Sequence, residues 1–210
     1  MYTHEYHERR EPRAPSRPVV LPPCIDRMST RLQGYLQNRG LAYSLALENG
    51  WYPTIDSDSY ARVVIPASSL FNSWPYYQAR LIVEAPPGVK RYVSPAAPRG
   101  DSLAIVFPGR RTLGSIIVEG PMDALAAAGM GYVGIGLMGN TPNDLVLNHI
   151  EQVVTVYGNC YVIPDRDAFK QGAEVTAKLW ARGVRCTLKS IQGAKDLAEL
   201  SPEHRKILIS

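Results

Sequence analysis

The chain has 210 residues and a formal net charge of +4, with 45% apolar and 20% charged residues. This composition suits one large globular domain or two small ones and indicates no fibrous or low-complexity class. No apolar run reaches the ~18–20 residues that span a bilayer, and the polar N-terminus lacks a signal-peptide core, so we expect a cytoplasmic protein without a membrane partner. Three widely spaced cysteines without a C-x-x-C pair argue against a disulfide framework and against zinc.

The first half of the chain predicts a tail followed by a small α+β unit. Residues 1–23 are rich in Arg, Glu and Pro, which predicts a flexible basic tail. In residues 24–110 the apolar spacing predicts helices over Arg31–Asn38 and Tyr43–Asn49, each followed by a glycine. Short strands broken by turn residues are expected over Ala61–Ile65, Tyr77–Glu84, Lys90–Val93 and Leu103–Val106.

Residues 111–210 alternate regularly between strand and helix patterns. Helices are expected over Asp123–Ala128, from Pro142 onward, and over Ala173–Arg182. The predicted strands are Ser115–Glu119, Tyr132–Met138, Cys160–Pro164 and Val184–Ile191. The first of these shows no polar alternation, as a strand buried on both faces should. The alternation predicts an α/β fold, with a parallel four-stranded sheet covered by helices.

Carboxylates follow three of these four strands. Glu119 ends the first strand, with Asp123 in the next helical turn, and Asp165 and Asp167 follow the third strand. Asp196 follows the fourth strand. Because ligands of such sheets bind at the carboxyl ends of the strands, we expect these acids to converge.

Each acid also has a simpler interpretation. Asp123 suits the positive end of a helix dipole, and Asp165 or Asp167 could cap the following helix. Convergence of several acids is harder to explain in this way, because packed carboxylates repel one another and a divalent cation relieves that cost. Oxygen ligands favour Mg²⁺ or Mn²⁺ over zinc, and no zinc is expected.

The acidic segments resemble the motifs of the Toprim family, in the variant found in DnaG-type primases. Ile116 to Ala126 resembles the first motif, E-G-x-x-D-A-L-A, and Ile163 to Asp167 resembles the D-x-D motif. Lys195 to Glu199 resembles the third acidic motif, and Gly136 to Thr141 resembles the small-residue loop between the first two. The resemblance implies a Toprim catalytic domain over residues 111–210.

The N-terminal half adds to this resemblance. Tyr35 to Leu41 resembles the Y-L-x-x-R-G-L signature at the start of the primase core, and Arg62 to Pro66 resembles the strand that follows. Gln78 to Arg80 and Arg91 to Pro95 resemble basic segments associated with template or nucleotide. Residues 24–110 are therefore expected to form the template-binding subdomain. The expected nucleic-acid or nucleotide contacts are Arg39, Arg80, Lys90, Arg91 and Lys195.

The resemblance implies a nucleotidyltransferase that synthesises RNA primers on single-stranded DNA from ribonucleoside triphosphates. Glu119, Asp165 and Asp167 are the implied catalytic residues, and together with Asp123 and Asp196 they are the implied ligands of Mg²⁺ or Mn²⁺. Family members usually carry a zinc-binding domain and a helicase-linked domain that this sequence lacks. We therefore expect a minimal phage or mobile-element primase, active in host cytoplasm if viral, with a separate helicase and a separate zinc-binding helper as primosome partners.

The third motif departs from the family pattern. Leu197 and Ala198 stand where Pro and Asp are common, so that one outer metal ligand is lost or replaced by Glu199. Two other functions remain open. The same acids could hydrolyse a phosphodiester in a Toprim-type nuclease, or the chain could be a non-catalytic module that binds single-stranded DNA or a helicase.

Overall fold

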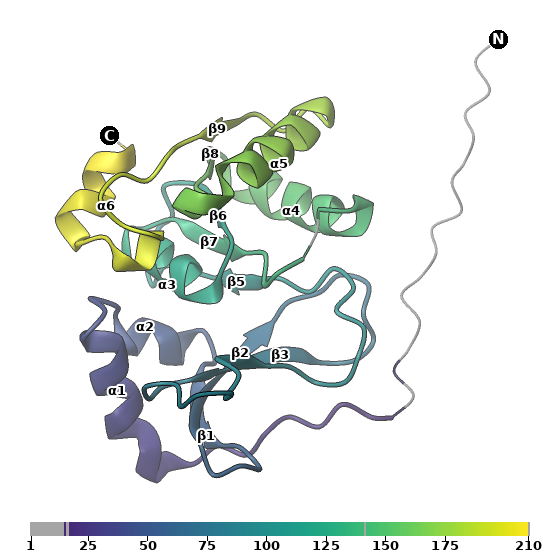
Figure 1. Ribbon diagram of the computed structural model, residues 1–210. Helices are drawn as coiled ribbons and strands as arrows, with labels where there is room; N and C mark the ends of the chain where they lie inside the picture. Colours follow the sequence, from purple (N-terminus) through teal and green to yellow (C-terminus); the bar gives the residue numbers. More distant parts are fainter. Residues whose placement is uncertain (1–14, 16, 141, 210) are drawn as a thin grey trace.

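The computed structural model describes residues 15, 17–140 and 142–209 and contains two sheets, one above the other in Figure 1. The N-terminal sheet has the strand order β1-β2-β3-β4, and the second sheet has the order β5-β7-β6-β8-β9. Most of the expected flexible tail, residues 1–14 and 16, lies outside the described residues. The end of that stretch is held to the first sheet, because the carbonyls of Pro22 and Pro23 accept hydrogen bonds from Tyr52 (2.9 Å) and Thr54 (2.8 Å).

The N-terminal unit is the expected α+β arrangement. Its helices are η1 (Asp26–Met28), α1 (Ser29–Gln37) and α2 (Tyr43–Glu48), so both predicted α-helices are confirmed. The predicted strands over the same region are also present, but the antiparallel sheet begins with a strand that was not predicted. Its members are β1 (Tyr52–Ile55), β2 (Ala61–Ala67), β3 (Tyr76–Leu81) and β4 (Tyr92–Val93).

The second sheet corrects the predicted parallel four-stranded sheet. Four strands are parallel, but β5 (Ala104–Val106) pairs antiparallel with β7, which makes the sheet five-stranded and mixed. The boundary expected from the sequence, at residue 110, assigns β5 to the N-terminal unit. Its hydrogen bonds, however, are made within the second sheet. β5 covers the edge of β7 that would otherwise expose unpaired backbone groups. The parallel strands are β6 (Ser115–Val118), β7 (Val133–Gly136), β8 (Cys160–Val162) and β9 (Cys186–Leu188).

Helices cover both faces of this sheet, as expected. The long helices are α3 (Pro121–Gly129), α4 (Asp144–Tyr157) and α5 (Phe169–Ala181). The shorter ones are η2 (Arg166–Ala168), η3 (Leu197–Glu199) and α6 (Pro202–Ile209), of which α6 was not predicted. Pro142 does not open α4, because Asn143 is its N-cap and accepts a hydrogen bond from the Val146 N–H at 3.0 Å.

Two apolar clusters lie on opposite faces of the second sheet. Ile116 and Val118 pack with α3 and continue into the apolar residues of α1, α2 and β2. Ile117 points to the other face and packs with residues of α4 and α5. The first cluster thus joins the two units into one body, with α2 and β2 beneath α3 and β5 in Figure 1. A close backbone approach explains Gly134, because a Cβ there would lie 2.0 Å from the Ala124 carbonyl oxygen.

Candidate active site

The predicted acids gather at one edge of the second sheet. Glu119 directly follows β6, and Asp165 follows β8 with Asp167 in the next turn. Asp123 lies in the first turn of α3, and Asp196 caps η3 after β9. Like-charge repulsion from Asp167 raises the pKa of Glu119, repulsion from Asp165 and Asp196 raises that of Asp123, and repulsion from Glu119, Asp167 and Asp196 raises that of Asp165, which links all five into one electrostatic group. We call these five residues the acid cluster.

Asp123 is the most deeply buried member of the acid cluster, at 6% exposed. Burial raises its pKa to about 8, with further contributions from the charges of Asp196 and Asp165. Its Oδ1 accepts a hydrogen bond from the Ala198 N–H at 2.9 Å. Asp123 therefore fastens the first acidic segment to the third, in addition to carrying charge.

Asp165 and Glu119 also have raised pKa values, although both side chains are less buried than Asp123. Burial is the main cause that raises the pKa of Asp165 to about 7, followed by the charges of Glu119 and Asp196. The pKa of Glu119 is also raised, chiefly by burial, although a backbone N–H of Asp165 partly opposes the shift. Within the described part of the chain, the buried Oε1 of Glu119 has no hydrogen-bond partner. The edge thus holds more negative charge than its protein surroundings compensate.

The acid cluster fits a hard divalent cation by its chemistry. All of its donors are carboxylate oxygens, they repel one another, and one buried oxygen lacks a partner. No group of three His, Cys, Asp or Glu side chains among the described residues is close enough to hold a metal ion as it stands. The cluster is therefore matched to such an ion in charge and ligand type, and is not a preassembled set of three ligands.

The third acidic segment is held by local capping. The Asp196 side chain accepts from the Glu199 N–H at 2.9 Å, while Glu199 accepts from the Lys195 N–H at 3.2 Å. This arrangement resembles a capping box around η3, with the Lys195 N–H in place of the N–H of the N-cap residue Asp196. Glu199 is thus engaged with backbone at the start of its own segment. Lys195 is exposed, and its charge lowers the pKa of both Glu119 and Asp165, which places it within electrostatic reach of the cluster.

Arg205 of α6 is a buried residue near the acids that sequence reasoning missed. Its guanidinium donates to the carbonyls of Leu197 (3.0 Å) and Ala198 (2.7 Å) in the third acidic segment. It also donates to the carbonyls of Arg39 (3.2 Å) and Gly40 (3.1 Å) in the N-terminal unit. The side chain thereby fixes the acidic segment against the turn after α1. No short motif marks it, because its partners are backbone atoms distant in sequence.

The four predicted basic residues of the N-terminal unit fall into two groups. Arg80 is buried, donates to the hydroxyls of Tyr35 and Tyr92, and lies with its guanidinium 4.9 Å from the Tyr92 ring centre. Arg39 lies 5.0 Å from the ring centre of the same Tyr35. The charge of Asp123 raises the pKa of Tyr92, so this aromatic–arginine group faces the acids.

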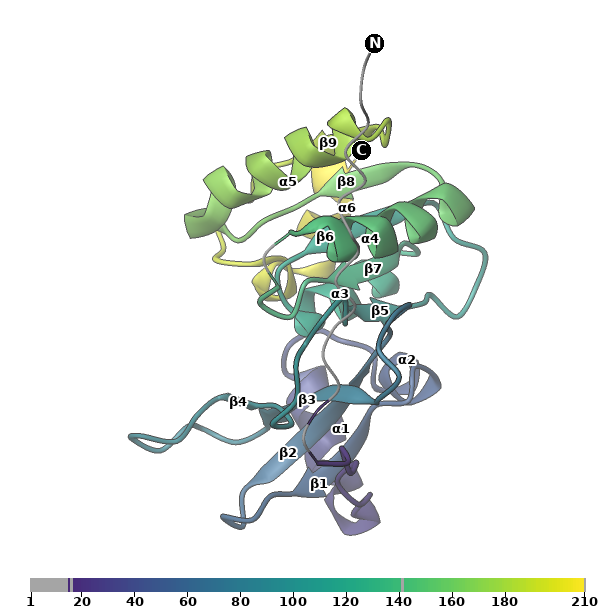
Figure 2. The same ribbon diagram turned by 90° about the vertical axis from the view of Figure 1, so that its right-hand side faces the viewer.

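Lys90 and Arg91 form the exposed group. They lie in the loop that leads into β4, which projects from the N-terminal sheet in Figure 2. Their backbone carbonyls accept from the buried Arg62 at 3.1 and 3.3 Å, so the loop is anchored while its side chains face outward. The structure thus brings Lys195 close to the acids, places Arg39 and Arg80 between the units, and leaves Lys90 and Arg91 on a separate projection.

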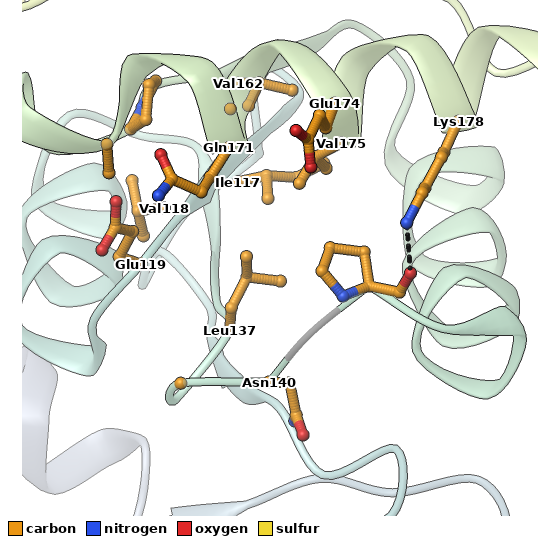
Figure 3. Close-up of a pocket in the computed structure, with 15 residues that line it drawn as sticks. Ile117, Val118, Glu119, Leu137, Asn140, Val162, Gln171, Glu174, Val175 and Lys178 are labelled. Atoms are coloured by element: carbon orange, nitrogen blue, oxygen red, sulfur yellow. Dashed lines mark hydrogen bonds between the residues drawn. The ribbon is translucent and has the colours of Figure 1, made fainter.

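A pocket of about 300 Å³ opens beside Glu119 (Figure 3). Its floor is formed by apolar side chains from the strands and from α5, including Ile117, Leu137 and Val175. Gln171, Glu174 and Asn140 stand around its rim. Lys178 closes the far side, where its ammonium group donates to the Pro142 carbonyl at 3.0 Å.

No protein-family description matches the sequence, and no curated protein is significantly similar to it. Solved structures do match. The RNA polymerase domain of Mycobacterium tuberculosis primase DnaG aligns with a TM-score of 0.61 and 12% identity, over 86% of this chain and 75% of that chain. The Aquifex aeolicus primase, comprising zinc-binding and RNA polymerase domains, gives 0.64 and 16%, over 88% and 59%. The primase fragment of the bacteriophage T7 primase-helicase protein gives 0.55 and 14%, over 83% and 71%.

The fold is that of a primase catalytic core. The resemblance stated from the motifs is thereby confirmed at the level of fold, and it extends across both units. The M. tuberculosis domain matches also in complex with a double-stranded DNA oligomer with a 6-nucleotide overhang, with a TM-score of 0.58 and 13% identity over 85% of this chain and 72% of that chain. At these identities the likeness establishes the architecture of the chain. In the described part of the chain no helix is both long and apolar enough to cross a bilayer.

Proposed function

We propose that this protein is a DNA primase, a nucleotidyltransferase with a Toprim catalytic domain that joins ribonucleotides on a single-stranded DNA template. The observation that carries the proposal is the acid cluster, whose carboxylates come from three strand ends of a primase-like fold, repel one another and form no salt bridge among the described residues. Charge left uncompensated in this way suits a site whose ligand brings positive charge with it.

In this proposal Glu119, Asp165 and Asp167 hold Mg²⁺ or Mn²⁺, with Asp196 beside them. The bound ions would lower the pKa of the attacking 3′-hydroxyl and neutralise charge on the departing pyrophosphate. In place of binding an ion, Glu119 can accept the proton of that hydroxyl, because its carboxylate follows β6 at the same strand edge as Asp165. Asp123 keeps the third acidic segment in register through its bond to the Ala198 N–H. The exposed Lys195 can pair with the triphosphate.

Template binding would use the basic residues of both units. Lys90 and Arg91 are exposed and can contact phosphates without reading sequence. The buried Arg80 is fixed by two tyrosine hydroxyls, so we propose that it shapes the surface facing the acids and carries less of the phosphate binding. A replicative helicase and a zinc-binding helper, as separate proteins, remain the proposed partners.

Primer synthesis on bare single-stranded DNA tests the proposal. Labelled ribonucleotides and Mg²⁺ should yield short RNA products with the unmodified protein and with Asp144→Asn. Asp144→Asn is the control, because it removes a carboxylate that is 92% exposed and lies outside the acid cluster. Asp165→Asn and Asp167→Asn should yield none. DNA degradation without ribonucleotides would instead identify a nuclease, and equal products from all variants would show that the acids are not catalytic.

A further inference from the structure

Cys160 and Cys186 are neighbours at the end of the second sheet opposite the acid cluster. They begin the adjacent parallel strands β8 and β9 and are direct partners in the register. Register partners on neighbouring strands lie about 4.8 Å apart and point to the same face. This separation falls within the Cα–Cα range of roughly 4.4–6.8 Å that disulfides accept. Both cysteines are 5% exposed and belong to the apolar cluster beneath α5.

The surroundings of the pair suit thiol chemistry. A surface pocket is lined by both cysteines and by Trp180 and Arg185, so the pair lies at the edge of the apolar cluster, beside space that is open to solvent. Contact between the thiols raises the pKa of Cys160 and lowers that of Cys186, which makes Cys186 the more acidic thiol. Ser115 is the register partner of Cys160 on its other side. Its buried hydroxyl has no partner in the described residues, so an unpaired polar group lies on the other side of Cys160.

We propose that Cys160 and Cys186 form a reversible disulfide by exchange with a small-molecule disulfide that enters the surface pocket. The Cys186 thiolate attacks one sulfur of the reagent, which releases one thiol and leaves a mixed disulfide. The Cys160 sulfur then attacks the Cys186 sulfur and expels the second thiol. The protein loses two hydrogens and the reagent gains two, so no other oxidant is needed.

The position of the two cysteines predicts that their disulfide is easily reduced. In-register Cβ atoms on parallel strands stand about as far apart as the strands, ~4.8 Å, whereas disulfides favour ~3.8 Å. One strand must therefore shift slightly, and strain of this kind makes a disulfide easier to reduce. β9 can shift because it is the last strand of the sheet and pairs on one side only. The cross-link would fasten β9, which leads to Asp196, to β8, which leads to Asp165.

Thiol counting with oxidised glutathione tests this site without reference to catalysis. The full chain carrying Cys24→Ser is used, because Cys24 is an exposed thiol that could react on its own. Under native conditions the count of free thiols should fall from two to none, with a mass loss of two hydrogens and one peptide joining Cys160 to Cys186. Dithiothreitol should restore both thiols. Cys160→Ser and Cys186→Ser on this background should form no cross-link.

Two results would overturn the proposal. One is a stable mixed disulfide with glutathione at either cysteine that does not close onto the other. The second is inertness of both thiols in the native protein, with reaction only after urea is added. The measurements with and without urea use only the Cys24→Ser chain, which keeps both Cys160 and Cys186. They therefore decide between these results even if a variant with a further serine fails to fold.

Discussion

The two units of this protein bury charge in opposite ways. In the N-terminal unit Arg62 is 2% exposed, yet it contacts the Asp56 carboxylate and donates to the carbonyls of Lys90 and Arg91. Asp101 is fully buried and accepts from the Ser69 hydroxyl and, at 2.7 Å, from the Leu70 N–H, with His149 3.3 Å away. In the second unit the acid cluster forms no salt bridge among the described residues, and burial and mutual repulsion raise the pKa of Glu119, Asp123 and Asp165.

This difference separates structural charge from functional charge. A buried ion whose hydrogen-bonding capacity is filled by fixed protein atoms contributes to one defined conformation. A group of like charges without such partners costs stability, and the cost is offset only when a ligand of opposite charge binds. We therefore expect that removing a buried, fully paired charge such as Arg62 lowers the free energy of unfolding. Removing an acid of the cluster should instead lower activity and leave the protein folded.

The largest expected effect is on catalysis. Asp167→Asn should lower primer synthesis by at least ~1,000-fold, because loss of a metal ligand removes several kcal/mol of transition-state stabilisation. The same variant should be folded and at least as stable as the unmodified protein, because one repulsive charge is gone. Product yield and urea unfolding, measured on one preparation, check both halves. A variant that loses activity only because it unfolds would show that Asp167 carries structural charge.

Next in size is the structural charge of the N-terminal unit. Arg62→Ala should cost about 3 kcal/mol in the free energy of unfolding, because it removes the cation that pairs with Asp56 Oδ2 and the donor to several carbonyls. Arg91→Ala, at an exposed position in the same region, should change it by less than about 0.5 kcal/mol. Urea denaturation measures both, and equal losses would remove the distinction between buried and exposed arginines.

Arg205 contacts both units, and its removal should have a smaller effect on stability than that of Arg62. Arg205→Met keeps an apolar stem but leaves four carbonyls without a donor, so we expect a loss of about 2 kcal/mol in unfolding free energy. Primer synthesis should fall about tenfold at temperatures where the variant is folded, because the third acidic segment is less well fixed. Arg205→Lys should recover part of the activity. Full activity in the folded methionine variant would contradict this role.

The repulsion within the acid cluster should also appear in the pH dependence of stability. An acid whose pKa is raised by folding binds a proton more tightly in the folded state, so its stabilising effect is complete below its ordinary value of 3.8. That effect is lost as the pH rises toward about 8 for Asp123. The metal-free protein should therefore melt at a lower temperature at pH 8.5 than at pH 6. Asp123→Asn should flatten this trend, whereas Asp144→Asn should leave it unchanged.

The smallest effect concerns the projecting basic residues. Lys90→Ala and Arg91→Ala should each reduce the slope of log affinity against log salt for single-stranded DNA by about 0.7. Fluorescence anisotropy at several salt concentrations measures this slope. A loss of affinity with no change in slope would show that these residues do not contact phosphates.

Local pattern predicted much of this fold, and non-local pairing accounts for the rest. Glu119, Asp165 and Asp167 could be placed together because the ends of parallel strands meet at one edge. β1 escaped prediction because Pro53 lies within it, which an edge strand tolerates. The apolar run of β5 marked a strand but not its partner, since either sheet could have accepted it.

The supporting residues around the site were the least predictable. Arg205 acts through backbone carbonyls that lie up to 166 positions away in sequence. Tyr35 and Tyr92 are ordinary aromatic residues of a helix and a strand until folding brings both hydroxyls to Arg80. No residue type or spacing marks such contacts, because they depend on how distant segments pack.

Calorimetric titration with Mn²⁺ tests most directly whether the acid cluster is a site for divalent cations. Injection of Mn²⁺ into the metal-free protein at pH 7 should show binding accompanied by proton release, because Asp123 and Asp165 are partly protonated beforehand. Asp165→Asn should abolish or strongly weaken this binding, and Asp144→Asn should preserve it. Binding of equal strength in Asp165→Asn, or no binding by the unmodified protein, would contradict the account.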